Sequence, residues 1–417
     1  MFFSDLVCMR CGKQPEQTWA YDECPHCKKD GISSNYSAHL DLSNFPLSKS
    51  LVEEEQPGIW KYRYLYAIKK ETKPISLIEG NTPLVHLKKI GEEVGLSELY
   101  GKDESRNPTW SHKDRLSCVG VTKAKEVGAD CIIVSSTGNQ GISAAAYVAK
   151  AGLRCVILTA NESPQVMKTL MQSYGAMVFQ IPTGEERIKL VEACVRELGW
   201  FPLTGFGNPS KGANPYALDG YKSIAVEILQ DLGDVPDKII FPTAGGDSLV
   251  GTWKGFVDLL NMKRIDKLPT MIACEPFGPL TKSVAENSQI PLEVEKGTTV
   301  AFSIATTSCT YQALKTLYDS HGYGVVVKDP DMMRMQQRLA ASEGIFAEPA
   351  SAMSVAAAEI LSLEGKIKPD EKVVAILTST GLKEPESAIE YLPKLSSLEP
   401  TLGALKRALK ESYNYTI

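Results

Sequence analysis

The nine residues Asn107-Pro-Thr-Trp-Ser-His-Lys-Asp-Arg115 end a loop and open a helix, and the rest of the chain is organised around them. Ser111 is a favourable N-cap, and Asp114, three residues later, is placed to complete a capping box. Apolar residues recur at helical spacing over residues 116–127, so the helix runs into the core. Lys113 then lies in the first turn, where the helix dipole lowers the pKa of its ammonium group. An uncharged lysine is a nucleophile that can form a Schiff base with an aldehyde, whereas the alternative is a solvated surface lysine.

Composition excludes several classes of protein. The chain has 417 residues, enough for two or three domains, with 43% hydrophobic and 23% charged residues. The net charge is −5 and no extended basic block is present, so we expect no nucleic-acid partner. No apolar run reaches the roughly 20 residues that a membrane span needs, and the N-terminus lacks a signal-peptide pattern. We therefore expect no membrane partner.

Four of the ten cysteines form two pairs, Cys8-x-x-Cys11 and Cys24-x-x-Cys27, with twelve residues between the pairs. Two such pairs supply the four thiolates of a tetrahedral zinc site, so we expect a structural zinc ion in a ribbon over residues 1–45. A redox dithiol and four unlinked thiols are the alternatives, and the polar, turn-rich surroundings argue against a redox site. The other cysteines occur singly in apolar segments, which favours a reducing cytoplasm.

Short apolar strands and amphipathic helices alternate between residues 130 and 198. The alternation resumes between residues 221 and 377. This pattern is typical of an α/β fold with doubly wound parallel sheets. The Pro-, Gly- and Asn-rich segment 206–215 interrupts the alternation, and we interpret it as a crossover between domains. The tail after about residue 400 is weakly helical.

Three loops follow strands at their carboxyl ends, where open α/β sheets bind ligands. Ser135–Gly141 is glycine-containing and offers the amide of Asn139. Pro242–Leu249 leads into a helix N-terminus, which is a natural phosphate cradle although Asp247 suits an anion poorly. Leu377–Gly381 adds three hydroxyl groups. Each loop alone is a generic turn, but together with the lysine they predict a pyridoxal phosphate (PLP) site.

A family resemblance extends over nearly the whole chain, and the ribbon and seven further segments carry it. These segments are Gly58–Arg63, Glu79–Val85, Asn107–Arg115, Ser135–Gly141, Trp253–Gly255, Glu343–Ala352 and Gly381–Pro385. With them the chain resembles the zinc-ribbon-bearing threonine synthases, which are fold type II PLP enzymes. The resemblance implies a tryptophan synthase β-like fold of two doubly wound α/β domains plus the N-terminal ribbon. The expected division is a ribbon at 1–45, a large PLP-binding domain at 55–125 and 206–400, a small domain at 126–205 and a tail at 401–417.

The resemblance also implies residue roles. Lys113 is the Schiff-base lysine and proton shuttle, Asn139 contacts the ring hydroxyl and Thr378 faces the pyridine nitrogen. The phosphate is wrapped by Ala244, Gly245, Gly246, Asp247 and Ser248. The substrate carboxylate is bound by Ser136, Thr137 and Gln140. Glu348 is interpreted as a helix cap or a structural pairing partner.

The chain departs from the family at four places. It has Trp110 where the family usually has glycine, and His112 where the family has phenylalanine; we favour packing over acid–base catalysis for this histidine. The loop 244–248 lacks the usual Gly and Asn content. Segment 302–308 lacks an arginine typical of the family. The segment therefore has no cation of this kind to bind the phosphate group of O-phosphohomoserine.

The leading hypothesis is a lyase that acts on a small amino-acid substrate, converting O-phosphohomoserine and water to threonine and phosphate by γ-elimination and β-addition. The alternatives are serine/threonine dehydratase-type deamination and β-replacement on an activated serine. A non-enzymatic hypothesis is a zinc-ribbon module on an inactive α/β scaffold. Homodimerisation is implied by the resemblance alone.

Overall fold

The computed structural model describes residues 3–15, 23–206, 212–393, 395 and 397–417. They form two compact units, divided between Glu384 and Pro385. The second unit contains α13 (Glu386–Ile389) and α14 (Leu402–Tyr413), whose N-cap Thr401 accepts the N–H of Ala404. The crossover expected at 206–215 lies partly outside the described residues, and the expected domain boundaries stay predictions.

The larger sheet of the first unit has six strands in the order β11-β10-β9-β12-β4-β3. Its strands are β3 (Leu84–His86), β4 (Leu99–Asp103), β9 (Lys238–Pro242), β10 (Thr270–Glu275), β11 (Tyr323–Val326) and β12 (Val373–Leu377). All neighbouring strands are parallel except β3, which pairs antiparallel with β4. The strand order reverses between β9 and β12, and such a switch point is where doubly wound sheets bind ligands.

Helices cover both faces of this sheet because successive strand residues point to opposite sides. Ile240 packs with residues of α2, α11 and α12, whereas Ile239 and Phe241 pack with α7, α8 and α10. These helices are α2 (Lys88–Val94), α7 (Lys222–Leu232), α8 (Asp247–Asn261), α10 (Tyr311–Asp319), α11 (Asp329–Arg338) and α12 (Pro349–Leu363). Short helical segments connect these elements: η1 (Gly58–Leu65), η2 (Glu104–Arg106), η3 (Ala217–Tyr221), α9 (Pro279–Ala285), η4 (Phe302–Ile304), η5 (Leu339–Glu343) and η6 (Gly381–Lys383).

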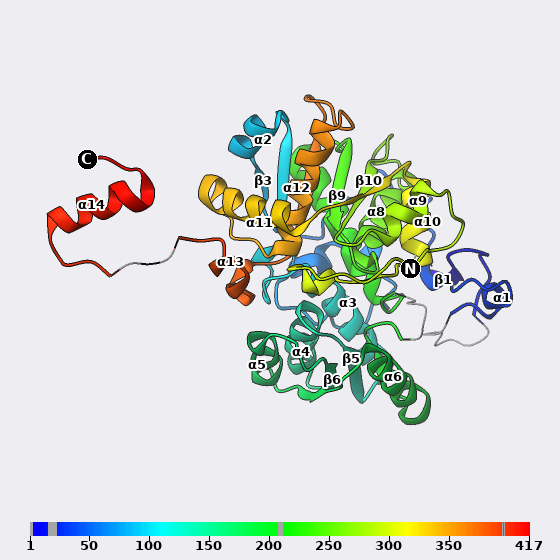
Figure 1. The fold of residues 1–417 in the computed structure, drawn as a ribbon. Helices are drawn as coiled ribbons and strands as arrows, with labels where there is room; N and C mark the ends of the chain where they lie inside the picture. Colours follow the sequence, from blue (N-terminus) through cyan, green and yellow to red (C-terminus); the bar gives the residue numbers. More distant parts are fainter. Residues whose placement is uncertain (1–2, 16–22, 207–211, 394, 396) are drawn as a thin grey trace. The chain divides into compact units, whose positions relative to one another are not determined.

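The smaller sheet is fully parallel, in the order β7-β6-β5-β8. Its elements are β5 (Cys131–Ser135), α4 (Asn139–Ala151), β6 (Arg154–Thr159), α5 (Gln165–Ser173), β7 (Met177–Gln180), α6 (Gly184–Leu198) and β8 (Phe201–Pro202). Ile132 packs with α4 and α5, and Ile133 packs with α6 on the opposite face. In Figure 1 this sheet lies below the larger one with its helices around it. The predicted α/β fold is confirmed.

The helix of the opening stretch, α3 (Lys113–Glu126), begins at the predicted lysine, but the predicted capping box is wrong. Asp114 does not cap Ser111. Its carboxylate accepts the N–H of Thr109 at 2.6 Å and the Thr109 hydroxyl at 2.5 Å. Thr109 is buried, so its two donors need an acceptor within the protein, and Asp114 is the group that supplies it.

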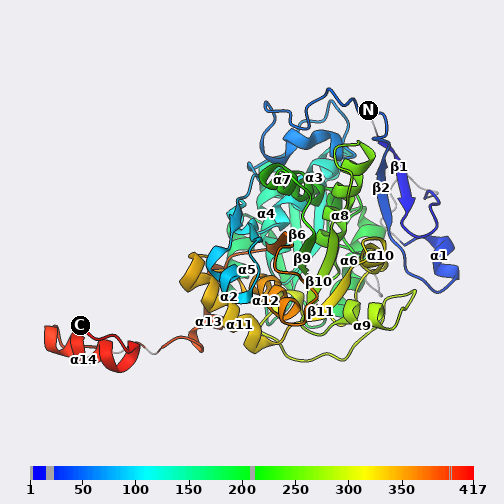
Figure 2. The same ribbon diagram turned by 90° about the horizontal axis from the view of Figure 1, so that it is seen from above.

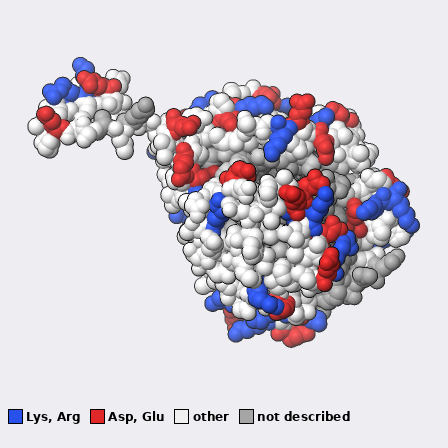
Figure 3. All heavy atoms as spheres, turned by 60° about the horizontal axis from the view of Figure 1, so that its bottom comes forward, with Lys and Arg blue, Asp and Glu red and all other residues white. Residues whose placement is uncertain are grey.

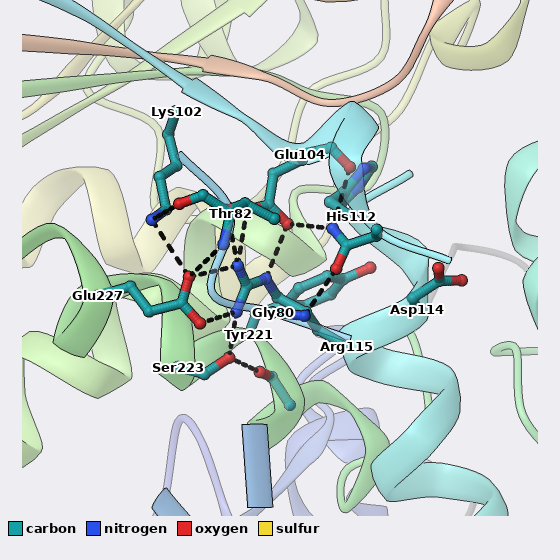
Figure 4. Close-up of polar contacts among 12 residues, drawn as sticks. Gly80, Thr82, Lys102, Glu104, His112, Asp114, Arg115, Tyr221, Ser223 and Glu227 are labelled. Atoms are coloured by element: carbon teal, nitrogen blue, oxygen red, sulfur yellow. Dashed lines mark hydrogen bonds and ion pairs between the residues drawn. The ribbon is translucent and has the colours of Figure 1, made fainter. Parts of the chain in front are cut away.

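Arg115, the third residue of α3, is completely buried and forms ion pairs with two carboxylates (Figure 4). Its guanidinium donates to both oxygens of Glu104 at 2.7 Å and to both oxygens of Glu227 at 2.7–2.8 Å. The hydroxyls of Thr82 and Ser223 accept further bonds. The pairing raises the pKa of Arg115 and lowers that of Glu227. The network therefore joins η2, α3, α7 and the loop before β3.

The cysteine pairs lie in a two-stranded antiparallel ribbon, β1 (Phe3–Cys8) and β2 (Tyr36–Leu40), with the short helix α1 (Pro25–Lys29). The four sulfur atoms of Cys8, Cys11, Cys24 and Cys27 all lie within 4.8 Å of one another. This cluster is compatible with a tetrahedral structural zinc ion. Figure 2 shows the ribbon beside α8, where the Lys254 ammonium donates to the Ser37 hydroxyl at 2.6 Å.

The charges on the molecular face drawn in Figure 3 are of both signs and interspersed, with white surface between them. Within the described part of the chain, no helix combines the length and apolar character that crossing a bilayer requires.

Replacing Arg115 with methionine should lower the free energy of unfolding by about 3–5 kcal/mol, because Glu104 and Glu227 would be left buried without their cation. Urea unfolding measures the loss. Arg154→Met is the matched control, since Arg154 forms an exposed ion pair with Asp130 and its loss should change little. Equal unfolding midpoints for the two variants would contradict the assignment.

Purified protein should contain about one zinc ion per chain, measured by atomic emission, and Cys24→Ser should lose it. Cys131→Ser, which changes a buried cysteine outside the cluster, should keep its zinc. Metal-free wild-type protein of normal thermal stability would show that the thiols do not form a structural site.

Candidate active site

One cavity of about 260 Å³ lies where the carboxyl ends of β5, β9 and β12 meet. All predicted site residues outside the ribbon line its wall: Lys113, Ser136, Thr137, Asn139, Gln140, Ala244, Gly245, Gly246, Asp247, Ser248 and Thr378. Nine further residues line the wall, and four of them, His112, Arg187, Ser303 and Glu348, carry polar side chains that were not assigned a ligand contact from the sequence. The fold thus brings together residues that are up to 265 positions apart, Lys113 and Thr378.

The segment before Lys113 is fastened to the loop after β12. The N–H of His112 donates to the carbonyl of Thr378 at 2.9 Å, and the hydroxyl of Ser379 donates to the carbonyl of Trp110 at 2.9 Å. These bonds run between two antiparallel stretches of chain. They fix the start of α3 beside the strand end that carries Thr378.

Trp110 adopts φ 59°, a backbone conformation that favours glycine. This conformation agrees with the glycine that the family which the sequence resembles usually has at this position. The indole is 42% exposed. The Ser379 hydroxyl and the Thr380 N–H, at 2.9 and 3.4 Å from the Trp110 carbonyl, hold this strained residue in place.

Lys113 is half-buried, and its Nζ lies 5.8 Å from the centre of the Tyr221 ring. Its pKa is lowered, as predicted, and burial is the main cause. The carboxylates of Asp247 and Glu348 act in the opposite direction. A larger neutral fraction makes Nζ a better nucleophile and proton acceptor.

His112 is buried and its ring stacks on Tyr221, with ring centres 5.5 Å apart. Nδ1 lies 3.1 Å from the carbonyl of Thr378, which can accept its proton. Burial, with the positive charge of Lys113, lowers the pKa of His112 well below its usual value. The side chain is therefore neutral, which agrees with the packing role favoured from the sequence.

Asn139 is held from both sides of its amide. Its Oδ1 accepts from the Lys383 ammonium at 2.7 Å, and its Nδ2 donates to Glu348 at 3.0 Å. All three side chains are buried. Burial lowers the pKa of Lys383 to about 8 and raises that of Glu348, although each is near the opposite charge. The second Nδ2 proton of Asn139 can therefore form a hydrogen bond with a ligand.

Sequence reasoning missed Lys383 and undervalued Glu348. Glu348 is the N-cap residue directly before α12, but its side chain makes no capping bond and instead contacts Asn139 and Thr378. Lys383 follows β12 by six residues and has no motif of its own. Only its place in the segment Gly381–Pro385, which carries the resemblance, could have indicated it.

The predicted phosphate loop ends at Gly246, which has φ 90°, and α8 begins at Asp247. The first N–H groups of a helix have no acceptor within the helix and suit an anion. Asp247 is the apparent obstacle. Its carboxylate accepts the N–H of Ala213 at 3.0 Å and the amide N–H of Gln312 at 3.4 Å, so hydrogen bonds within the protein occupy one of its oxygens.

In the loop after β5 and at the start of α4, Ser136 and Gln140 each keep one side-chain proton available for a ligand. The Ser136 oxygen accepts the N–H groups of Gly138 at 3.2 Å and Gly141 at 2.9 Å, which leaves its hydroxyl proton for a ligand. Gln140 donates one amide proton to Ser117 at 3.3 Å and retains the other.

This donor set fits pyridoxal phosphate. The cavity contains a lysine with a lowered pKa, a helix N-terminus for a phosphate and a fixed amide for a ring hydroxyl. Thr378, at the end of β12, contributes a neutral hydroxyl that is 2.8 Å from the Ser351 hydroxyl. A neutral partner is compatible with an unprotonated pyridine nitrogen.

Residues 75–379 match the family described as "Pyridoxal-phosphate dependent enzyme". Among curated proteins, threonine synthase of Methanocaldococcus jannaschii is 34% identical over 413 residues, 97% of this chain and 99% of that protein. Threonine synthase of Methanosarcina acetivorans is 32% identical, covering 97% and 98%. That of Bacillus sp. (strain ULM1) is 35% identical, covering 79% and 90%.

Solved structures share the fold at lower identity. Threonine deaminase isoform 2 of Solanum lycopersicum has a TM-score of 0.63 and 20% identity, covering 75% of this chain and 84% of that one. An O-ureido-L-serine synthase has a TM-score of 0.62 and 22% identity, covering 76% and 94%. The chain therefore belongs to the pyridoxal-phosphate dependent enzymes, in the family of the threonine synthases.

Proposed function

We propose that this PLP-dependent lyase converts O-phosphohomoserine and water to threonine and phosphate, with Lys113 as the cofactor-linked lysine. The convergence of Lys113, Asn139, Thr378 and the loop 244–248 on one cavity wall carries the proposal. Identity over nearly the full length of relatives named threonine synthase supports this substrate. The likeness to deaminases and racemases is one of fold alone.

Each cavity residue has a role that its bonding allows. Bound PLP supplies the capacity to take up electrons from the substrate's α carbon. The free hydroxyl proton of Ser136 and the unpaired amide proton of Gln140, with Thr137, bind the substrate carboxylate. The Nζ of Lys113, whose lowered pKa favours its neutral form, accepts the α proton and returns a proton in a later step. Asn139 and Thr378 orient the cofactor ring.

A dehydratase-type deamination is the second candidate. Segment 302–308, whose Ser303 and Ile304 line the cavity, lacks the arginine expected for a phosphorylated substrate. Assay of the purified protein with O-phosphohomoserine and, separately, with threonine and serine distinguishes the two. Phosphate release with threonine formation supports the synthase, and a 2-oxo acid formed without phosphate release refutes it.

We further propose that the protein is a homodimer and that it lies in a reducing cytoplasm. All ten cysteines are free in the structure, which supports a reducing compartment. Light scattering of the purified protein measures the oligomer.

Lys113→Ala should abolish turnover and the visible absorption band of the bound cofactor, because no other described residue of the cavity wall carries an amine that could replace Nζ. Lys189→Ala, which changes an exposed lysine paired with Glu185, should keep both. A wild-type protein that remains colourless with excess PLP would instead support an inactive scaffold.

Lys383→Met should weaken PLP binding by about 10-fold, because Asn139 loses a charge-assisted hydrogen bond. In wild-type protein, raising the pH through about 8 removes the charge of Lys383, so PLP affinity should fall by about 5-fold. The methionine variant should lack this inflection.

Absorbance titration across pH measures both effects. Lys366→Met removes an exposed lysine and serves as the control. An unchanged pH profile in Lys383→Met would show that the ammonium does not act on the cofactor site.

A further inference from the structure

A second cavity of about 900 Å³ opens from the first one. The two share wall residues, among them Thr137 and Ser303. The larger cavity is bounded by residues 160–164, the start of α6 and segment 296–306. A ligand extending beyond Lys113 toward the small sheet therefore enters a space large enough for an additional charged group.

Arg187, on α6, lines both cavities. The side chain is half-buried, and its Nε is buried without a hydrogen-bond partner in the part of the chain that the structure describes. Burial lowers the pKa of this guanidinium, an effect that Glu162 opposes. Leaving a buried charged donor unsatisfied costs free energy, so such a group is typical of a ligand site.

Lys296 also lines the larger cavity, and it forms no ion pair with a described residue. Ser303 contributes a hydroxyl to both cavities. Two cations from separate elements thus face one space, together with a hydroxyl. Guanidinium and ammonium groups in this arrangement suit a phosphate monoester dianion.

Among the acidic residues at the start of α6 and on the described wall of the larger cavity, one has neither an ion-pair partner nor a capping bond. Glu186 closes the capping box of Thr183 at 2.8 Å, and Glu185 pairs with Lys189 at 2.7 Å. Glu162 is the exception: it lines the cavity, is exposed, and lies beyond ion-pair distance of Arg187 in the described structure. The two cations outnumber this single carboxylate.

We propose that Arg187, assisted by Lys296, binds the phosphate group of a phosphorylated amino-acid substrate in place of the arginine missing from 302–308. This inference rests on the proposed function. Two phosphates must be held during that reaction, and the loop 244–248 with the N-terminus of α8 accounts for the cofactor's. Arg187 comes from the small sheet's helix α6 and reaches the larger cavity, where the substrate's phosphate has room.

Arg187→Ala should raise the KM for O-phosphohomoserine by about 10- to 100-fold, because a charge-assisted bidentate contact is lost. Lys296→Gln should have a smaller effect, since this lysine is exposed and screened by salt. Lys189→Gln removes one exposed cation from the same helix and should behave as wild type. Inhibition by homoserine, which has no phosphate, should be equal in Arg187→Ala and wild-type protein.

Calorimetric titration of the PLP-loaded protein with inorganic phosphate tests the site without turnover. Arg187→Ala should bind phosphate at least about 10-fold more weakly while its dissociation constant for PLP is unchanged. Equal phosphate affinities, or weakening of PLP binding alone, would overturn the inference. If wild-type protein releases no phosphate from O-phosphohomoserine but still binds phosphate through Arg187, the proposed reaction fails and the anion site stands.

Discussion

The buried guanidinium of Arg115 is the interaction on which the arrangement of the first unit depends. It lies two residues after Lys113 and bonds both carboxylate oxygens of Glu104 and of Glu227. Lys102, at the adjoining strand, adds a second cation 3.1 Å from Glu227. Such a network is stable only when every partner is in place, because any unpaired member would be a buried charge. It therefore specifies one register for α3 against α7 and β4.

This constraint on α3 positions Lys113, the lysine that we propose to be catalytic. On one side Arg115 fastens the helix to the core, and on the other the chain around Trp110 is bonded to Ser379 after β12. Lys113 lies between these two anchors at the strand-order switch. The burial that lowers its pKa follows from that position. The same loop after β12 leads to Lys383, which orients Asn139 from behind. Each of the two segments, the start of α3 and the loop after β12, thus combines residues that fasten the fold with residues at the cavity.

Alternation of apolar strands with amphipathic helices was sufficient to predict the α/β fold, because that pattern depends on local periodicity. The strand-to-helix loops could be predicted to meet at one edge for the same reason. Asp114 was misassigned because its partner, Thr109, is chosen by burial and not by helix spacing. Lys383 and Arg187 were not predicted, because the places that they occupy at the cavities arise only after distant elements have packed. Strand β11 was also missed, since Tyr323–Val326 is too short to show a period.

A crystal structure of the PLP-loaded protein would test the central claim most directly. We expect continuous density between the Nζ of Lys113 and the cofactor, with the cofactor phosphate within hydrogen-bond distance of the N–H groups of residues 244–248. The amide of Asn139 should contact the ring hydroxyl while its bonds to Lys383 and Glu348 persist. Cofactor bound elsewhere, or a phosphate seated on Arg187 with Lys113 unattached, would contradict this account of the site.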